Sequence, residues 1–335
     1  MTAHPTAHPT AGTRGVGPGT TTDAMKVTRV PWQIKFTALA FIWGSSFLLM
    51  KVGLRSLAPL QISGLRILSG AAVLLLLLTA ARGRLPRDRR IWGHLMVTGF
   101  FLGSLPFSLF ALGEERVSSA LAGIGNSITP IATVLFSLLL LRHDKIETRK
   151  IVGVLIGFVG VLVIMQPWQS QGRPDLLGFG MTLVAGTSYG VGWTYTKRFL
   201  TKADFGGLTL PAAQMLTSAA QMVIALLVWW FVQRSHLSLA APWSLHANTE
   251  GGSVLLPVLA VLALGVVGTG IAMSFQYDVV RAAGPTVGAS VTYLIPVVSV
   301  ALGVLVLHER LQWPQFAGAA VVLSAAVLIG RSRRR

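Results

Sequence analysis

The chain has 335 residues, of which 53% are hydrophobic and 12% are charged. Soluble domains use roughly 45–50% apolar and about 25% charged residues, so this composition excludes an ordinary soluble globule and indicates a chain that crosses a membrane repeatedly. The 28 Lys and Arg outnumber the 11 Asp and Glu, but they fall mostly in short connectors and at the chain ends, which favours the lipid bilayer over nucleic acid as their partner.

The first thirty residues differ from the rest of the chain. Residues 1–30 are rich in Thr, Pro, Gly, Ala and His and contain no apolar run. Such a composition cannot bury enough apolar surface to offset the entropy cost of ordering, so we expect a disordered N-terminal tail. His4 and His8 recur in the word Thr-Ala-His-Pro, but two histidines in a tail of this kind are a weak metal signal, and we expect no metal site there.

Long apolar runs follow this tail. Each is near or above the roughly 20 residues with which a helix spans a bilayer, which predicts an all-α integral membrane protein with ten transmembrane helices. A nine-helix alternative would omit the second run, which Arg66 interrupts, and would put the Arg-rich ends on opposite faces. We predict spans at 36–54, 59–80, 92–113, 117–141, 151–167, 177–198, 207–232, 253–277, 284–307 and 314–330.

The basic residues orient these spans. With ten helices both chain ends lie on one side, and that side receives most of the 28 Lys and Arg, including those in 82–90 and 331–335. Cytoplasmic connectors carry the excess of Lys and Arg in membrane proteins, so we predict a multi-pass protein of the cell inner (plasma) membrane with both termini in the cytoplasm. The opposite side holds only Lys51, Arg55, Arg116, Arg173, Arg234 and Arg310.

The two halves of the chain repeat each other. A gapless shift of 166 residues aligns the third and fourth spans with the eighth and ninth, so that Pro130 falls on Pro296. Near the starts of the halves, Gly44-Ser45-Ser46-Phe47 matches Gly186-Thr187-Ser188-Tyr189. Recurrence of such words in order predicts a duplicated unit. The other matches are Gly99 with Gly265, Ser108 with Ser274, Leu68–Ala72 with Leu216–Ala220, and Asp144-Lys145-Ile146 with Glu309-Arg310-Leu311.

Each half is therefore predicted to be a five-helix unit. We place the first repeat at 34–167 and the second at 177–330, followed by a basic C-terminal tail at 331–335. An odd number of spans forces the second unit to enter the membrane from the other face, so the repeats are inverted. Many carriers use this architecture, with two similar halves meeting near the bilayer midplane.

These residues resemble one EamA unit of the drug/metabolite transporter superfamily, repeated twice. The resemblance covers roughly residues 34–330 and implies ten helices, both ends in the cytosol and transport of a small metabolite. The words that carry it are Trp43-Gly44-Ser45-Ser46-Phe47, Arg66, Pro130 and Gly153 in the first half, and Pro296, Glu309-Arg310-Leu311 and Gly318 in the second. The departures from the family pattern are His143-Asp144-Lys145 and Glu114-Glu115.

Arg66 is the one clearly intramembrane charge in the sequence. Burying it without a partner would cost from about 2.5 kcal/mol upward, so it must reach water, a carbonyl or an anion. It either lines a cavity or extends along its own stem to the outer interface. Its repeat mate Gln214 is also polar, which favours a cavity between the halves, and we predict that both residues bind substrate.

Pro130 and Pro296 interrupt matching helices. Each removes a backbone hydrogen bond and frees the carbonyl four residues earlier, that of Asn126 in the first half and that of Thr292 in the second. Matched helix breaks in two halves point to a transporter site, because unwound backbone at membrane depth occurs beside a cavity or packed protein. A kink that only shapes packing is the alternative. We predict that Asn126, Thr292 and Tyr293 line the site.

Aromatic side chains gather at mid-membrane positions. Trp43 and Ser46 lie well inside the first span, whereas a Trp of an interfacial belt sits near a span end. Trp193 and Tyr293 add aromatic surface from the second half. An aromatic pocket with few polar groups suits a small, partly apolar metabolite, although each ring could instead serve helix packing or face lipid.

Chemistry of other kinds has little support. The chain has no Cys, no phosphate-binding loop and no H-E-x-x-H word, so we predict no cofactor, no metal and no enzyme activity. Gly186-Thr187-Ser188-Tyr189-Gly190 fits G-x-S-x-G, but it lies within a predicted helix rather than at a strand-to-helix elbow. The carboxylates fall at span ends or in connectors. Coupling through Glu114 or Glu115 and uncoupled transport both stay open.

The sequence thus predicts a membrane carrier that exports or exchanges a small metabolite, an amino acid or a related compound, by alternating access. Two alternatives stay open: a membrane scaffold that transports nothing, and a lipid-modifying enzyme using Glu114-Glu115. Gly153 and Gly157 form a small-xxx-small pair that serves either packing within the bundle or a homodimer.

Overall fold

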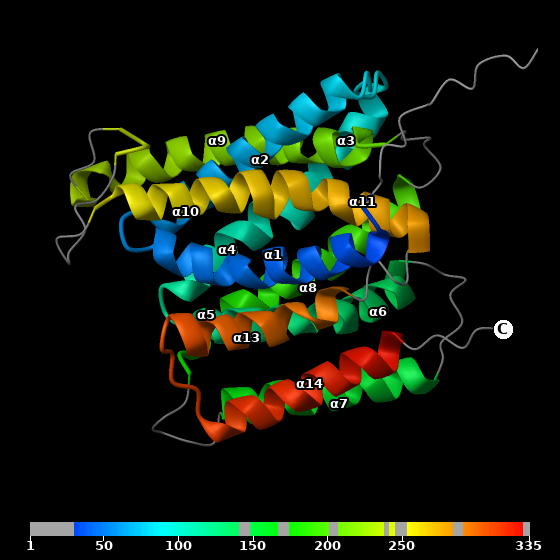
Figure 1. Ribbon diagram of the computed structural model, residues 1–335, viewed down its shortest axis with the longest axis vertical. Helices are drawn as coiled ribbons and strands as arrows, with labels where there is room; N and C mark the ends of the chain where they lie inside the picture. Colours follow the sequence, from blue (N-terminus) through cyan, green and yellow to red (C-terminus); the bar gives the residue numbers. More distant parts are fainter. Residues whose placement is uncertain are drawn as a thin grey trace, which may run out of the picture. The chain divides into compact units, whose positions relative to one another are not determined.

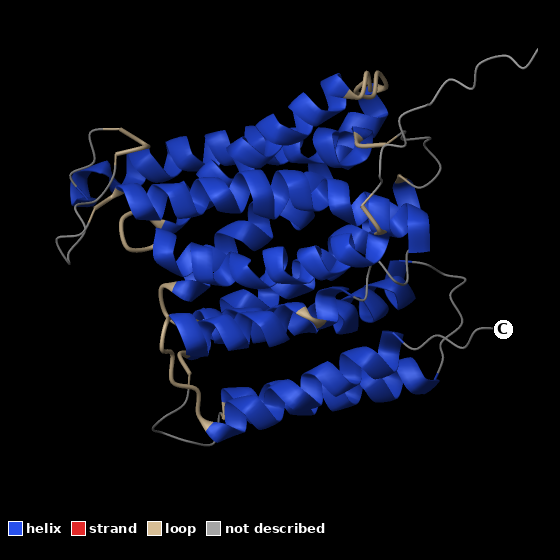
Figure 2. Ribbon diagram, viewed as in Figure 1, coloured by secondary structure: helices blue, strands red, loops and turns tan. Residues whose placement is uncertain are grey.

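The structure is a computed structural model that describes residues 30–140, 148–166, 174–200, 207–237, 241–244, 253–283 and 291–330. Every regular element in these ranges is helical (Figure 2). Almost all of the predicted tail at 1–30 and the whole tail at 331–335 lie outside them, so the expected disorder stays a prediction.

Ten helical segments follow one another along the described chain, as the sequence predicts. Six are long and apolar enough to cross a membrane by length and composition, and 151–164 and 291–306 are shorter apolar helices. The segments of the first half are α1 (Trp32–Gly53), α2 (Pro59–Ala80), α3–η1–α4 (Arg89–Gly99, Phe100–Ser104, Leu105–Glu114), α5–η2–α6 (Ser119–Gly125, Asn126–Ile128, Thr129–Leu140) and α7 (Thr148–Met165).

The second half has the same sequence of elements. Its segments are α8 (Leu176–Phe199), α9 (Thr209–Leu237), α10–η3–α11 (Leu255–Gly265, Val266–Ile271, Ala272–Ala283), η4–α13 (Val291–Tyr293, Ile295–Val306) and α14 (Trp313–Gly330). Helix α9 continues to Leu237 instead of ending at 232. The start of the ninth span, expected at 284, lies outside the described residues.

The halves interlock instead of packing as two separate bundles. Helix α1 packs on α13, α10 and α11 of the second half, and its repeat mate α8 packs on α6 and α4 of the first. Helix α2 lies against α9, and α7 lies beside α14 (Figure 1). The contacts that a helix makes with the other half therefore have counterparts in the contacts of its repeat mate. Two inverted repeats related by a pseudo-twofold axis have this property.

Matching irregularities interrupt matching helices. The π turns η1 (Phe100–Ser104) and η3 (Val266–Ile271) are separated by the same 166 residues that align the two halves. The 3-10 turns η2 (Asn126–Ile128) and η4 (Val291–Tyr293) stand just ahead of the two prolines. Short π and 3-10 stretches inside α-helices are frequent at functional sites and hinges.

Close helix crossings explain where the π turns begin. A Cβ at Gly99 would lie 3.0 Å from the Gln214 carbonyl oxygen, and a Cβ at Gly265 would lie 2.6 Å from the Arg66 carbonyl oxygen. Glycine lets the two backbones approach where any side chain would separate them. These crossings place Arg66 and Gln214, which are repeat mates, beside the two π turns.

Candidate functional site

A cavity of about 120 Å³ lies where the two halves meet. This volume is below the roughly 300–1,000 Å³ of sites for drug-sized ligands, so a small metabolite suits it better than a lipid. All residues predicted to line the site except Tyr293 line it. Its lining consists of Trp43, Ser46, Phe47, Met50, Arg66, Leu102, Phe107, Phe110, Asn126, Thr129, Tyr189, Trp193, Gln214, Gly268, Thr269, Met273, Thr292 and Ile295.

Arg66 is buried in the wall of the cavity and does not extend along its own stem to the outer surface. Only 7% of the residue is exposed, its Nε donates a hydrogen bond to Thr269 Oγ1 at 3.2 Å, and its guanidinium lies 3.7 Å from the centre of the Phe107 ring. No carboxylate of the described residues comes within 4.0 Å of it. A hydroxyl and an aromatic face stabilise the cation only partly, so the guanidinium can still bind an anionic group.

Trp43 is held by the π turn of the opposite half. Its indole Nε1 donates to the Gly268 carbonyl oxygen at 3.1 Å. A π turn changes the backbone hydrogen-bond register and makes a carbonyl available to a side-chain donor, and η3 supplies Gly268 in this way. Ser46 Oγ donates to the Ile42 carbonyl of its own helix at 3.0 Å, so the Ser46 hydroxyl offers the cavity an acceptor and not a donor.

Two amide side chains supply further polar groups. Asn126 Oδ1 accepts a bond from Thr129 Oγ1 at 3.4 Å, and the buried Gln214 lies against the cavity from α9. The Asn126 carbonyl, which we expected Pro130 to leave open, accepts from the Thr129 backbone N–H. The 3-10 turn therefore gives this carbonyl a hydrogen-bond donor of its own, so Asn126 contributes its side-chain amide to the site and not its backbone carbonyl.

The prediction for Tyr293 differs from the structure. Tyr293 does not line the cavity, whereas its neighbour Thr292 and Ile295 do. Residues three apart share a face of a 3-10 turn, so Thr292 of η4 and Ile295, which follows it as the first residue of α13, face the cavity together, whereas Tyr293 does not line it. Trp193 does line the cavity, but 47% of it is exposed, so it forms the edge of the site and not its interior.

The sequence comparison decides the family. Residues 31–166 and residues 176–331 each match the EamA-like transporter family. The chain belongs to the EamA-like transporter family. It is therefore a multi-pass membrane transporter with two EamA domains, and not an enzyme.

Curated EamA relatives match along most of their length. The inner membrane transporter YedA of Escherichia coli (strain K12) is 28% identical over 295 residues, covering 87% of this chain and 88% of its own. The "Probable amino-acid metabolite efflux pump" of the same strain is 24% identical over 289 residues, covering 84% and 89%. A transporter of Archaeoglobus fulgidus is 26% identical over 305 residues, covering 90% and 99%.

A solved crystal structure shows that this fold occurs elsewhere. It is 19% identical in sequence, has a TM-score of 0.58, and the match covers 89% of this EamA chain and 95% of the other. At this identity the likeness concerns the fold alone.

Several lining residues escaped the sequence reasoning, yet the EamA repeat contains a signal for them. The missed residues include Leu102, Phe107 and Met273. The repeat links some of them to each other, since carrying the aromatic residue Phe107 to its repeat mate gives Met273. The mates that both line the cavity are Phe47 with Tyr189, Arg66 with Gln214, Leu102 with Gly268, Phe107 with Met273, Asn126 with Thr292, and Thr129 with Ile295.

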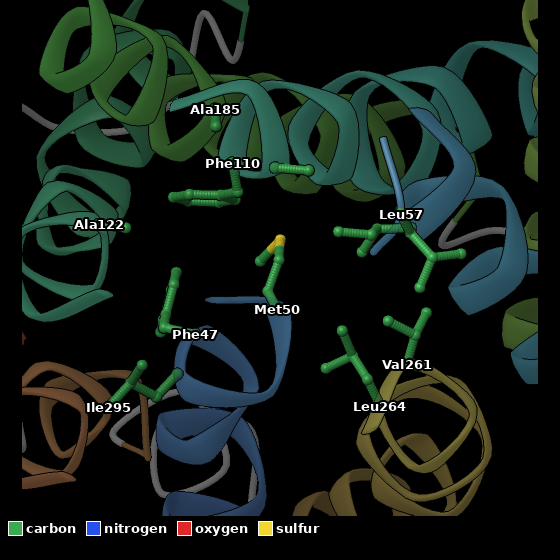
Figure 3. Close-up of a cluster of buried hydrophobic side chains, with 11 residues drawn as sticks. Phe47, Met50, Leu57, Phe110, Ala122, Ala185, Val261, Leu264 and Ile295 are labelled. Carbon is green, nitrogen blue, oxygen red and sulfur yellow. The ribbon is translucent and has the colours of Figure 1, made fainter. Parts of the chain in front are cut away.

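An apolar plug borders the cavity in the EamA bundle. Phe47 and Met50 from α1 point toward Phe110 of α4 (Figure 3), and the Phe47 and Phe110 rings meet edge to face with centroids 5.3 Å apart. Leu57, Val261 and the rest of the cluster surround them. The side chains of this plug are buried and packed together, and Phe47, Met50 and Phe110 among them also line the cavity.

Charged and polar groups lie beyond the plug, at what we call the Glu114 end. Lys51 Nζ donates to the carbonyl oxygens of Glu114 and Val117, which joins α1 to the turn between α4 and α5. Partial burial raises the pKa of the Glu115 carboxyl, which lies at the turn outside α4. At the opposite end, Lys35 of α1 pairs with Asp278 of α11. In the described residues no group of three or more His, Asp or Glu could hold a metal ion.

Proposed function

We propose that this transporter moves a small metabolite with an anionic group, an amino acid or a related compound, by export or exchange across the inner membrane. Arg66 is the observation that carries the proposal, because a buried guanidinium without a carboxylate partner among the described residues favours a solute that brings the negative charge. The printed name of one relative, an amino-acid metabolite efflux pump, supports the same class of solute.

The proposed binding mode uses three kinds of lining group. Arg66 attracts the anionic group, while the amides of Asn126 and Gln214 orient the polar remainder by hydrogen bonds. Trp43 and Trp193 cover the apolar surface of the solute. A site of this kind, mostly aromatic with few polar groups, binds by excluding water and selects by its polar groups.

The proposed transport step is alternating access. The two EamA halves rock about the cavity. The helices bend at the π turns η1 and η3 and at the 3-10 turns ahead of Pro130 and Pro296. The proposed orientation puts both termini in the cytoplasm. Because a Cβ at Gly157 would meet Ile131 and Ala325 of the same chain, the described contacts of this glycine serve packing inside the bundle, and we propose no homodimer.

The test compares intracellular and external metabolites of cells that express the parent protein, Arg66→Ala, Arg66→Lys or no protein. We expect the parent to change the level of one or more small anionic or zwitterionic metabolites and Arg66→Ala to abolish that change at equal membrane abundance. Arg66→Lys should keep part of it, since a lysine keeps the charge but not the planar fork.

Arg55→Ala is the matched control, because Arg55 is an exposed arginine near the end of α1. It should transport like the parent. Unchanged transport by Arg66→Ala would remove Arg66 from the site. If the parent changes no metabolite and single cysteines at the cavity react from neither side of the membrane, the scaffold alternative gains instead.

A further inference from the structure

Glu114 is an unusual residue for the end of a membrane helix. It is the last residue of α4 and is 0% exposed. Both of its carboxylate oxygens are buried, and neither has a hydrogen-bond partner. An ionised carboxylate without water or donors is very costly in an apolar setting, whereas a protonated one costs much less. The geometry is therefore that of a carboxyl group that holds a proton in this conformation.

The charged groups around Glu114 are engaged elsewhere. From α1, Lys51 Nζ donates to backbone carbonyls, including that of Val117 at 3.0 Å, and not to the Glu114 carboxylate. From the connector after α13, the Glu309 carboxylate accepts the amides of Ser119 and Ala120 at 2.7 and 3.0 Å. Arg66 of α2 acts on Glu114 only at longer range. Glu115 and Arg116 follow Glu114 directly, on the exposed side of the same turn.

Glu114 is also connected to the cavity through its own helix. Phe107, Phe110 and Glu114 are three and four residues apart and share one face of α4. The first two line the cavity, and Phe110 belongs to the plug. On the facing helix, Met50 of the plug immediately precedes Lys51. Separation of α1 from α4 at the plug must therefore also pull Lys51 away from the Glu114 and Val117 carbonyls.

We propose that Glu114 is a proton-binding site that couples opening of the Glu114 end to pH: its carboxyl is protonated while that end is closed, releases the proton to water on the same side when the end opens, and takes up a proton again on closing. In the open state the Lys51 ammonium, freed from the two carbonyls, pairs with the ionised carboxylate. The proposal rests on the proposed transport function and adds a dependence of its opening step on pH. High proton concentration at the Glu114 end favours the closed state, and low proton concentration favours the open one.

The first experiment measures proton binding directly. Purified protein in lipid vesicles is titrated with acid and base, and infrared difference spectra record the C=O stretch of protonated carboxylic acids. We expect a band that appears on acidification in the parent and in the matched control Glu115→Gln, and that is lost in Glu114→Gln. Glu114→Asp should restore a titrating band. A band that persists unchanged in Glu114→Gln would overturn the proposal.

The second experiment measures opening. The natural chain has no cysteine, so Met273→Cys places a single thiol at the cavity. The rate at which it reacts with a membrane-impermeant thiol reagent is divided by the rate for the exposed Trp243→Cys. This ratio removes the intrinsic pH dependence of thiol chemistry. We expect this ratio to change with pH in the parent background and to be constant in Glu114→Gln. A constant ratio in the parent background would refute the coupling.

Neither readout requires a transported solute. A wrong substrate class would leave both results as expected and would fail only in the Arg66 comparison, so the two proposals can fail independently. If Glu114→Gln does not fold, Glu114→Asp decides the matter, because moving the carboxyl must shift its infrared band if Glu114 is the titrating group.

Discussion

Gly123 sets the distance between α5 of the first half and α13 of the second. A Cβ at this position would lie 1.8 Å from Ser299 Oγ and 2.6 Å from Ser299 Cβ, both buried. Glycine removes the side chain where two helices from different repeats cross, as small residues do in membrane bundles. The interface between the halves therefore depends on the size of single side chains.

Replacement of Gly123 by Ala should destabilise the protein by about 1–3 kcal/mol, because the added methyl group forces α5 and α13 apart. Thermal unfolding in detergent would show a lower midpoint than in the parent. Gly180→Ala is the control, since a Cβ there meets nothing within 4 Å, and it should be neutral or slightly stabilising.

The double variant Gly123→Ala/Ser299→Gly tests the cause. Removing the Ser299 side chain opens the space that the new methyl group needs, so the double variant should recover much of the lost midpoint. If the two effects simply add, the clash is not the reason for the loss.

Single residues of the site were predictable to different degrees. Arg66 stood out because a charge inside an apolar run needs a partner, and its mate Gln214 followed from the repeat. Phe107 gave no signal, since an aromatic residue in a membrane helix faces lipid or protein with equal ease. Thr292 and Tyr293 were both predicted and only Thr292 lines the cavity, because apolar periodicity does not reveal the local phase of a 3-10 turn.

At the level of elements, the ten spans were readable from hydropathy, but the π turns were not. The π turns contain no proline, and each has one polar residue, Ser104 in η1 and Thr269 in η3, which alone does not predict a π turn in a membrane helix. They arise where Gly99 and Gly265 allow a backbone from the other half to come close, which is a property of tertiary packing. The 3-10 turns were foreseeable in position, because Pro130 and Pro296 remove a helical hydrogen bond.

The N-terminus of α5 in the first half is capped by a residue of the second half. The first-turn amides of α5 are all engaged: Ser118 Oγ accepts from Leu121, and the Glu309 carboxylate accepts from Ser119 and Ala120. Glu309 comes from the connector between α13 and α14, so the second half caps a helix of the first. Carboxylates at a helix N-terminus are favoured by both hydrogen bonds and the helix dipole.

Loss of this cap should be measurable. Glu309→Ala leaves two buried amides without an acceptor and should cost about 1 kcal/mol, in the range of other N-cap losses, lowering the unfolding midpoint. Arg310→Ala, at the exposed neighbouring position, should unfold like the parent. Equal midpoints for Glu309→Ala and the parent would show that water replaces the cap.

For the whole molecule, the antiparallel relation of the halves was foreseeable from the odd number of spans per repeat. The mutual packing of α1 on α13 and of α8 on α6 was not, because sequence matches show that two segments are alike and not which surfaces they bury. Orientation in the membrane stays a prediction from the distribution of Lys and Arg.

Single cysteines can test that orientation. Gly93→Cys lies in the first turns of α3, where a Cβ meets nothing within 4 Å, and Trp243→Cys lies in the exposed segment after α9. An impermeant reagent added outside intact cells should label the cysteine at 243 and not the one at 93. The reverse pattern would invert the protein in the membrane, and labelling of both from outside would contradict the ten-span topology.

The repeat-related pairs around the cavity are alike in place and unlike in chemistry. The repeat mate of the cation Arg66 is the amide Gln214, and the repeat mate of the aromatic Phe107 is the thioether Met273. If a solute were rotated by half a turn about the pseudo-twofold axis, its anionic group would meet Gln214 instead of Arg66. The part of it beside Phe107 would meet the flexible side chain of Met273. The chamber is thus polarised although the scaffold is nearly symmetric, and under the proposed transport function we expect a bound solute to keep one orientation throughout the cycle.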